Sequence, residues 1–102
     1  CEELLTLPEP PDAIFTGNNL ITLGALEVIH KRNLKIPEDV AIIGFDDMHW
    51  ASSLNPPLTA VRQPAREIGK RAGELLIQRI NDPERSSIQM VLSAELMKRS
   101  SA

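Results

Sequence analysis

The sequence predicts an α/β fold built on a parallel sheet. Three segments support this prediction: an apolar run at Ala13–Thr16, an amphipathic stretch at Leu20–Arg32, and a second apolar run at Val40–Phe45. The second run shows no polar alternation, which is typical of a strand covered by helices on both faces. Strand, helix and strand in this order form one βαβ unit, in which the two strands run parallel.

Proline, glycine and asparagine mark the limits of these first elements. The segment Leu7–Asp12 contains three prolines, so we expect a loop there. Gly17 ends the first strand, and Asn18 or Asn19 can cap the helix that follows. Within Leu20–Arg32 the apolar residues recur at helical spacing, and some of them extend beyond the face that one sheet would cover.

The second half of the chain predicts one long helix between two extended segments. Residues Leu58–Gln63 are expected to be extended, after a short segment at Met48–Leu54 whose state the pattern does not decide. A strong amphipathic pattern predicts a helix over Pro64–Asn81, with the proline in its first turn. Apolar and polar residues then alternate from Ile88 to Leu96, as in a half-buried strand.

Composition narrows the possible classes of protein. The 102 residues are 42% hydrophobic and 25% charged, values typical of one ordered globular domain. The net charge of −3 provides no basic excess for nucleic acid, and no apolar run is long enough to cross a bilayer, so we expect no membrane partner. A single cysteine and two distant histidines match no disulfide or zinc pattern, so no metal and no cofactor are expected.

Polar residues follow both predicted strands at the point where each strand ends. Asn18 and Asn19 follow the first strand, and Asp46 and Asp47 follow the second. Because parallel strands point the same way, these side chains should meet at one edge of the sheet, where open α/β sheets bind ligands. Amides donate and accept hydrogen bonds and carboxylates accept them, so together they suit a ligand rich in hydroxyl groups, such as a sugar.

Other interpretations of these residues stay open. Asn and Asp after a strand are also preferred helix caps, so capping and ligand contact compete at all four positions. Trp50, the only tryptophan, could stack on a ligand or pack in the core. The adjacent carboxylates of Asp46 and Asp47 could hold Mg²⁺ in an enzyme, but no nucleophile–base pair accompanies them, and we expect no enzymatic activity.

With these residues identified, the chain resembles the C-terminal part of a LacI/GalR-type transcription regulator. The likeness extends from about Pro11 to Ser100, nearly the whole chain, and is most specific where Gly44-Phe45-Asp46-Asp47 is combined with Pro56-Pro57-Leu58-Thr59. The stretches that match the family's motifs are Ala13–Ala25, Ile36–Asp47, Pro56–Pro64 and Glu95–Ser100.

The resemblance implies a three-layer lobe like that of a periplasmic sugar-binding protein, in a molecule with two lobes around an effector cleft. Residues of about 11–58 and 86–100 would belong to the C-terminal lobe, and about 59–85 would form a crossover and a helix of the N-terminal lobe. The chain would be a fragment of a cytoplasmic regulator. Operator DNA would be bound only through an N-terminal helix-turn-helix domain, to which nothing in these residues corresponds.

The resemblance also implies roles for single residues. Asp46, Asn18 and Gln63 match positions that contact the effector, and Trp50 joins them as the stacking candidate noted above.

Subunit pairing and hinge motion also have candidate residues. Leu20, Leu23 and Leu54 lie where such proteins form homodimers, although packing in the lobe's own core is an open alternative. The segment Pro56–Pro64 is the expected hinge, with Pro57, Thr59 and Gln63 as its candidates.

Two functions are compatible with this fold. The first is an effector-binding and dimerisation module in which a small molecule, expected to be a sugar, shifts the population of lobe arrangements and so controls DNA binding elsewhere. The second is a periplasmic solute-binding protein for transport, which would use the same cleft.

Overall fold

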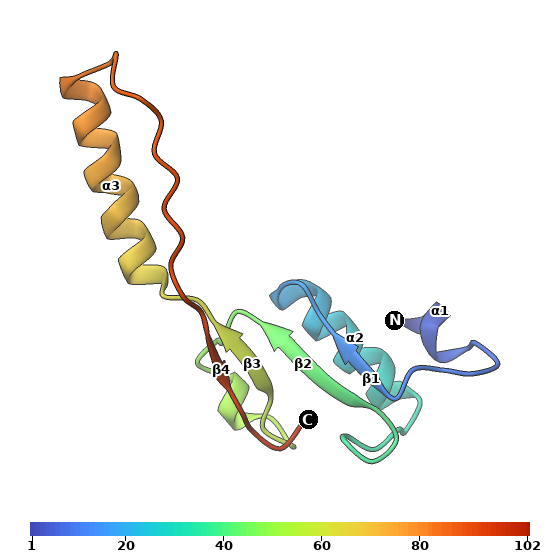
Figure 1. Ribbon diagram of the computed structural model, residues 1–102. Helices are drawn as coiled ribbons and strands as arrows, with labels where there is room; N and C mark the ends of the chain where they lie inside the picture. Colours follow the sequence, from blue (N-terminus) through green and yellow to red (C-terminus); the bar gives the residue numbers. More distant parts are fainter. The chain divides into compact units, whose positions relative to one another are not determined.

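The computed structural model describes residues 1–102, and these residues form two compact units (Figure 1). The first unit comprises Cys1–Arg62 together with Glu95–Ala102, and the second comprises Gln63–Ala94. None of the helices combines the length and apolar character that crossing a bilayer requires.

The first unit is built on a four-stranded sheet with the strand order β1-β2-β3-β4. Its strands are β1 (Ala13–Phe15), β2 (Ala41–Phe45), β3 (Thr59–Arg62) and β4 (Glu95–Met97). The first three run parallel, and β4 pairs antiparallel with β3 at the edge. The structure therefore confirms the predicted βαβ unit and an α/β fold with a mostly parallel sheet.

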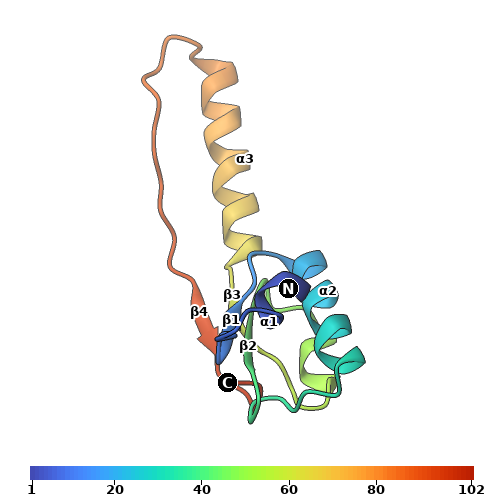
Figure 2. The same ribbon diagram turned by 90° about the vertical axis from the view of Figure 1, so that its right-hand side faces the viewer.

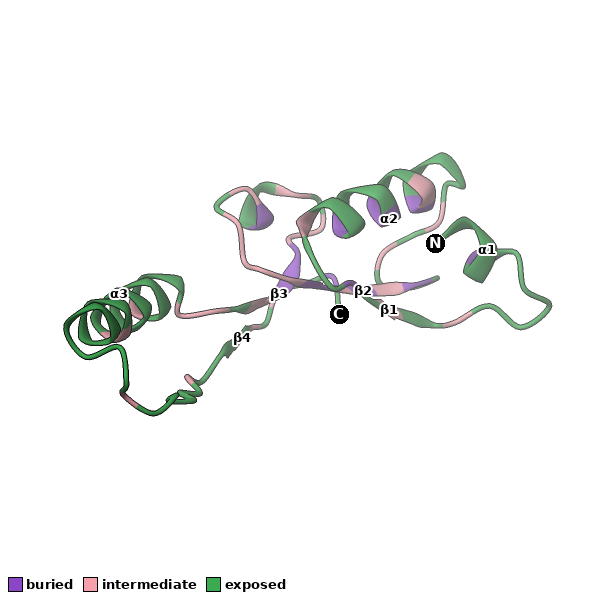
Figure 3. Cartoon of the chain, turned by 90° about the horizontal axis from the view of Figure 1, so that it is seen from above, coloured by how far each residue is buried: buried purple, intermediate pink, exposed green.

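Helix α2 (Asn19–Lys31) connects β1 to β2 and covers one face of this sheet. The short 3-10 helix η1 (Ala51–Ser53) and the four-residue helix α1 (Glu2–Leu5) lie on the same side (Figure 3). The apolar face of α2 packs on the inward side chains of the strands and on the loop before β3, which forms the core of the unit. The largest fully buried apolar side chains of this core are Ile29, Val40, Ile42 and Leu58.

The opposite face of the sheet carries aromatic side chains that the chain does not cover. Phe15 is 62% exposed and meets Phe45 edge to face, with ring centroids 6.3 Å apart. Within these residues helices therefore cover one face only, and the predicted three-layer form stays a prediction for the longer protein.

The second unit consists of helix α3 (Ala65–Asn81) and a segment that returns alongside it, as both Figure 1 and Figure 2 show. The helix begins one residue after the predicted start, because Pro64 occupies the cap position, and it ends at the predicted residue. Its apolar stripe has no buried residue in this unit, and Leu76, Ile77 and Ile80 are more than half exposed.

One predicted strand is much shorter than its pattern. The alternation from Ile88 to Leu96 predicts a strand over that whole range, but only Glu95–Met97 is extended in a ladder, so the prediction is wrong for residues 88–94. The cause is the partner: β3 ends at Arg62, which pairs with Glu95, and no strand lies beside the residues before it. Without a neighbour to accept ladder hydrogen bonds, an alternating sequence does not form a strand.

Candidate functional site

Strands β1, β2 and β3 end at the same edge of the sheet, and their last residues bring several polar side chains to that edge. Asn18 follows β1 through a short connection, Asp46 and Asp47 directly follow β2, and Arg62 is the last residue of β3. The structure thus confirms that the amide and carboxylate pairs lie at the same edge, which we call the rim.

The rim begins with a capped helix. Asn18 has an extended backbone, and its Oδ1 accepts a hydrogen bond from the amide of Ile21 at 2.9 Å, so Asn18 is the N-cap of α2. Asn19 is the first helical residue and is half-buried. Of the two uses proposed for Asn18, capping is therefore confirmed, and ligand contact through its side-chain NH₂ group stays a prediction.

Two buried threonines next to the rim form hydrogen bonds that connect its elements. The hydroxyls of Thr16 and Thr22 lie 2.6 Å apart, with Thr16 also 3.2 Å from the carbonyl of Ile43 and Thr22 2.8 Å from the carbonyl of Asn18. Two hydroxyl protons serve these three contacts, so each hydroxyl has a partner in either arrangement. This pair ties the start of α2 to β1 and β2 and fixes the position of the cap.

Asp46 occupies an unusual backbone conformation. Its φ of 74° lies in the left-handed region, which Asp and Asn tolerate better than most residues because of their short polar side chains. Its amide donates to the carbonyl of Val61 at 2.9 Å, which continues the bonding between β2 and β3 by one residue. Asp46 as a whole residue is half-buried.

The next residue, Asp47, is at the centre of an ion-pair cluster. Its side chain is only 2% exposed. Arg99 binds it with both terminal nitrogens, Nη1 to Oδ1 at 2.7 Å and Nη2 to Oδ2 at 3.0 Å. Arg62 adds Nη2 and Nε contacts to Oδ2 at 2.6 and 3.1 Å. We call Asp47, Arg62 and Arg99 the arginine cluster.

The arginine cluster sets the ionisation of its carboxyl group. Hydrogen bonds from Arg99 hold the pKa of Asp47 below its usual value, and the Arg62 contacts act in the same direction against the opposing effect of burial. The pKa of Arg99 is raised in turn by its bonds to Asp47. Asp47 is therefore a carboxylate at neutral pH, with both oxygens engaged by guanidinium groups.

This arrangement disfavours the magnesium site considered for Asp46 and Asp47. Two cationic guanidinium groups, each within 3.1 Å of an oxygen of Asp47, occupy the positions that a divalent cation would need and repel it. The carboxylate of Asp47 is thus paired with guanidinium groups and is not available to a metal ion.

Two other predicted residues pack against the core. Trp50, the stacking candidate, and Leu54, a predicted dimer residue, are both partly buried against the core cluster of the first unit. The packing alternative thus describes where both side chains lie, and ligand contact by Trp50 and subunit contact by Leu54 stay predictions.

The other two predicted dimer residues point to solvent. Leu20 is 81% exposed and Leu23 is 46% exposed, and Ile21 between them is exposed too. The core alternative therefore does not describe Leu20 or Leu23 in this chain. A face of α2 that carries such apolar side chains is typical of a protein–protein contact.

The predicted hinge residues fall on both sides of the boundary between the units. Pro57 accepts a hydrogen bond from the amide of Ser101 at 3.1 Å, and the amide of Thr59 donates to Oγ of Ser101 at 2.8 Å. Pro57 and Thr59 are thus held inside the first unit. Gln63 is the first residue of the second unit. Rotation at these residues stays a prediction.

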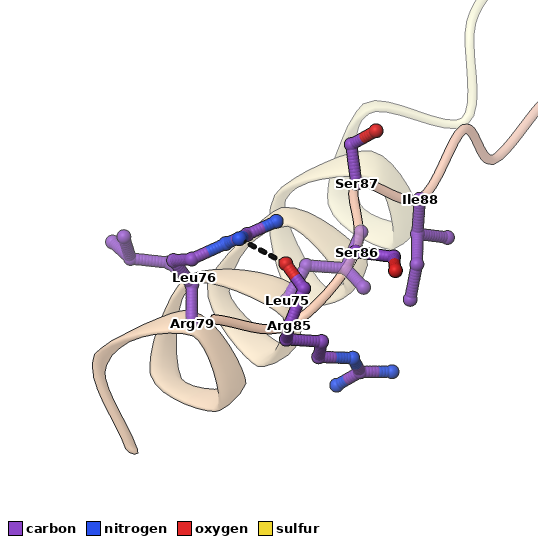
Figure 4. Close-up of a pocket in the computed structure, with 7 residues that line it drawn as sticks. All are labelled: Leu75, Leu76, Arg79, Arg85, Ser86, Ser87 and Ile88. Carbon is purple, nitrogen blue, oxygen red and sulfur yellow. Dashed lines mark hydrogen bonds between the residues drawn. The ribbon is translucent and has the colours of Figure 1, made fainter. Parts of the chain in front are cut away.

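Hollows in each unit are lined by residues other than the predicted ligand-binding residues. In the first unit a hollow of about 30 Å³ is lined by residues such as Leu26, His30 and Pro56. In the second unit, a groove of about 290 Å³ lies near the end of α3. Figure 4 draws its lining residues, among which Arg79 donates to the carbonyl of Arg85. Neither of these two hollows is lined by Asn18 or Asp46.

Sequence reasoning missed the arginine cluster. Arg99 is 52 residues from Asp47 along the chain, and no local pattern predicts which carboxylate it binds. The only signal was indirect, since Arg99 belongs to the closing stretch that matches the family's motif.

The family model described as the periplasmic binding protein-like domain matches residues 1–102. The chain belongs to this family.

Several known proteins also resemble the chain. It is 40% identical over 100 residues to the ribose operon repressor of Escherichia coli K12, covering 98% of this chain and 30% of the repressor. A LacI transcriptional regulator from Bacillus cereus subsp. cytotoxis superimposes with a TM-score of 0.91 at 30% identity, covering 99% of this chain and 36% of that one. A LacI-family regulator from Enterococcus faecalis V583 with bound ribose gives 0.83 at 32% identity, covering 97% and 36%.

These matches confirm the predicted likeness to LacI/GalR-type regulators and the periplasmic-binding-protein-like fold. The chain spans about a third of the length of the relatives described here. Those relatives are named as a repressor and as regulators, which agrees with the expectation that this family member is not an enzyme.

Proposed function

We propose that the chain is the effector-binding part of a LacI-family transcription regulator and that its rim contacts a sugar. The observation that carries the proposal is Asp46: a carboxylate at the carboxyl end of the central parallel strand β2, where α/β sheets bind ligands. A relative 32% identical to this chain holds ribose, which supports a sugar as the ligand class.

The other predicted contacts complete a set suited to hydroxyl groups. Asn18 keeps its NH₂ group available as a donor while its oxygen caps α2. Gln63 would add an amide from the crossover into the second unit, and Trp50 would contribute an apolar surface. The remaining contacts would come from the longer protein. There the first unit would form part of the C-terminal lobe, and α3 would belong to the N-terminal lobe.

In the whole protein, sugar binding would favour one arrangement of the lobes over the other. A DNA-binding domain outside these residues would then bind the operator more tightly or more weakly. The exposed apolar face of α2 at Leu20 and Leu23 supports a homodimer as the working form. A regulator of this kind acts in the cytoplasm. Transport, the second use of the same fold, is less well supported because the relatives are named as a repressor and regulators.

The test is titration calorimetry of the full-length protein with a panel of mono- and disaccharides, with D-ribose as the first probe. Asp46→Asn is the preferred variant, because Asn tolerates the left-handed backbone and keeps the shape of the side chain. A charge-assisted hydrogen bond contributes roughly 1.5–3 kcal/mol, so the variant should bind its sugar about 10- to 150-fold more weakly.

The proposal predicts that at least one sugar binds and that Asp46→Asn weakens that binding while the protein remains folded. Asp46→Ala should abolish binding, at some additional cost in stability from the positive φ. Unchanged affinity in both variants would remove Asp46 from the site, and a panel without any binding sugar would contradict the ligand class.

A further inference from the structure

We propose that Asp47 is a positioning residue for sugar binding: through Arg99 and Arg62 it fixes the backbone turn that presents Asp46 to the ligand. This inference rests on the proposed function and deepens it. Asp47 itself touches no ligand in this account, because its carboxylate is turned into the arginine cluster and is nearly inaccessible.

The first support is the surroundings of Asp47. A carboxylate that is only 2% exposed has lost most of its hydration, and such a group is retained in proteins when charged donors replace the water. Here Arg99 donates two hydrogen bonds to the carboxylate, and it also donates to the carbonyl of Leu58 at 2.7 Å. The side chain of Asp47 is thus bound by a residue that follows β4, and that residue is fixed in turn by Leu58, directly before β3.

The second support is the way Asp46 is held on both sides. On one side, the amide of Asp46 donates to the carbonyl of Val61, a residue of β3. On the other side, the side chain of the next residue, Asp47, binds Arg62, which is also on β3. The left-handed turn at Asp46 is therefore tied to the same strand before and after the residue, and this leaves its carboxylate little freedom of direction.

The third support is the cost of the conformation that is held. The φ of 74° at Asp46 is less costly for aspartate than for most residues, but it is still less favourable than ordinary backbone angles and is retained where neighbouring contacts fix it. The bonds of Asp47 provide that restraint. Without them, the turn can relax toward ordinary backbone angles, and the carboxylate of Asp46 would move away from the direction that the ligand needs.

The experiment compares Asp47→Asn with wild-type full-length protein by titration with the sugar that binds most tightly in the panel above. Asn keeps the size of the side chain but loses the charge, and its NH₂ group faces guanidinium donors. We expect the Kd of the folded protein to rise roughly five- to tenfold, a coupling of the size seen between residues in contact. The free energy of unfolding is measured in parallel, and titrations are run where every variant is fully folded.

Two further variants separate positioning from simple stabilisation. Glu2→Gln removes a carboxylate–arginine pair of the same unit, Glu2 with Arg32, that lies at the other end of α2 from the rim, and it should leave the Kd unchanged. Arg99→Gln should raise the Kd for the sugar, as Asp47→Asn does. The Kd of the double variant should not exceed the higher of the two single-variant values, because both changes break the same contact.

Each outcome decides the proposal. If Asp47→Asn lowers the free energy of unfolding but leaves the Kd unchanged, the role of Asp47 is purely structural and the proposal is overturned. Additive effects of the two changes on the free energy of sugar binding in the double variant would overturn the proposal too. If Asp47→Asn does not fold, Arg99→Lys decides in its place: a raised Kd supports the proposal and an unchanged Kd contradicts it. Failure of the proposed function appears differently, as wild-type protein that binds no sugar or as Asp46→Asn with full affinity.

Discussion

Two adjacent carboxylates at the end of β2 have different surroundings. As whole residues both are half-buried, but the side chain of Asp47 is only 2% exposed and lies between two arginines, whereas Asp46 forms a left-handed turn at the rim. The sequence shows them as a pair of equal residues. Their environments assign the first to ligand binding, as proposed above, and the second to holding the turn.

The lowered pKa of Asp47 predicts a specific loss of stability in acid. Because its folded pKa lies below the ordinary carboxyl value, the arginine cluster stabilises the fold fully above about pH 4. That contribution is lost as the pH falls through the lowered folded pKa. Urea unfolding from pH 7 to pH 2 should show Asp47→Asn less stable than wild type by about 2 kcal/mol at pH 7. The difference should disappear at the acid end, and a difference independent of pH would contradict this account.

Gly44 predicts a second effect at the residue scale. A Cβ at this position would lie 3.1 Å from Cδ2 of Leu58 and 3.4 Å from Oγ1 of Thr22, both in the packed layer between β2 and α2. Gly44→Ala should therefore lower the free energy of unfolding by roughly 1–3 kcal/mol. Gly17→Ala is the matched control, since nothing lies within 4 Å of the added methyl group. Equal free energies of unfolding of the two variants in urea would contradict this prediction and show that Leu58 and Thr22 shift to make room for the methyl group.

At the scale of elements, the sequence predicted those whose signals are local. The βαβ unit follows from apolar runs and helix spacing, and α2, β2 and α3 match their predicted ranges to within one residue at each end. The prediction of a strand from Ile88 was wrong for residues 88–94. Alternation of apolar and polar residues indicates that a chain has two different faces, but it contains no information about whether a neighbouring strand is present. The arginine cluster was not predictable for a similar reason, since its members lie 15 to 52 residues apart.

The exposed apolar face of α2 predicts self-association. Leu20→Arg should shift the full-length protein from dimer toward monomer, because a charge in an apolar contact is costly. The fold should be unaffected, since the side chain of Leu20 is 81% exposed. Sedimentation velocity measures the shift, with Leu7→Arg in the N-terminal loop as the control at another exposed leucine. A dimer equally stable in both variants would place the pairing surface elsewhere.

At the scale of the whole molecule, binding and stability should be linked. A ligand that binds only the folded protein at 100 times its Kd adds about 2.7 kcal/mol to the free energy of unfolding. Sugar should therefore raise the Tm of the wild-type protein. Asp46→Asn at the same sugar concentration should show a much smaller rise, and an equal rise would indicate a binding site that does not use Asp46.

The candidate site was only partly predictable at this scale. Parallel strands made the shared edge of Asn18 and Asp46 predictable, and the structure confirms it. The rest of the proposed sugar site was not predictable from these residues, because we propose that its other contacts come from the longer protein.

The most direct test of the central claim is a crystal structure of the full-length protein with the sugar that binds in the titrations. The account predicts a sugar hydroxyl within hydrogen-bond distance of a carboxylate oxygen of Asp46, with Asp47 still bound to Arg99 and not to the sugar. A sugar bound elsewhere, or one contacted by Asp47 while Asp46 faces solvent, would contradict it.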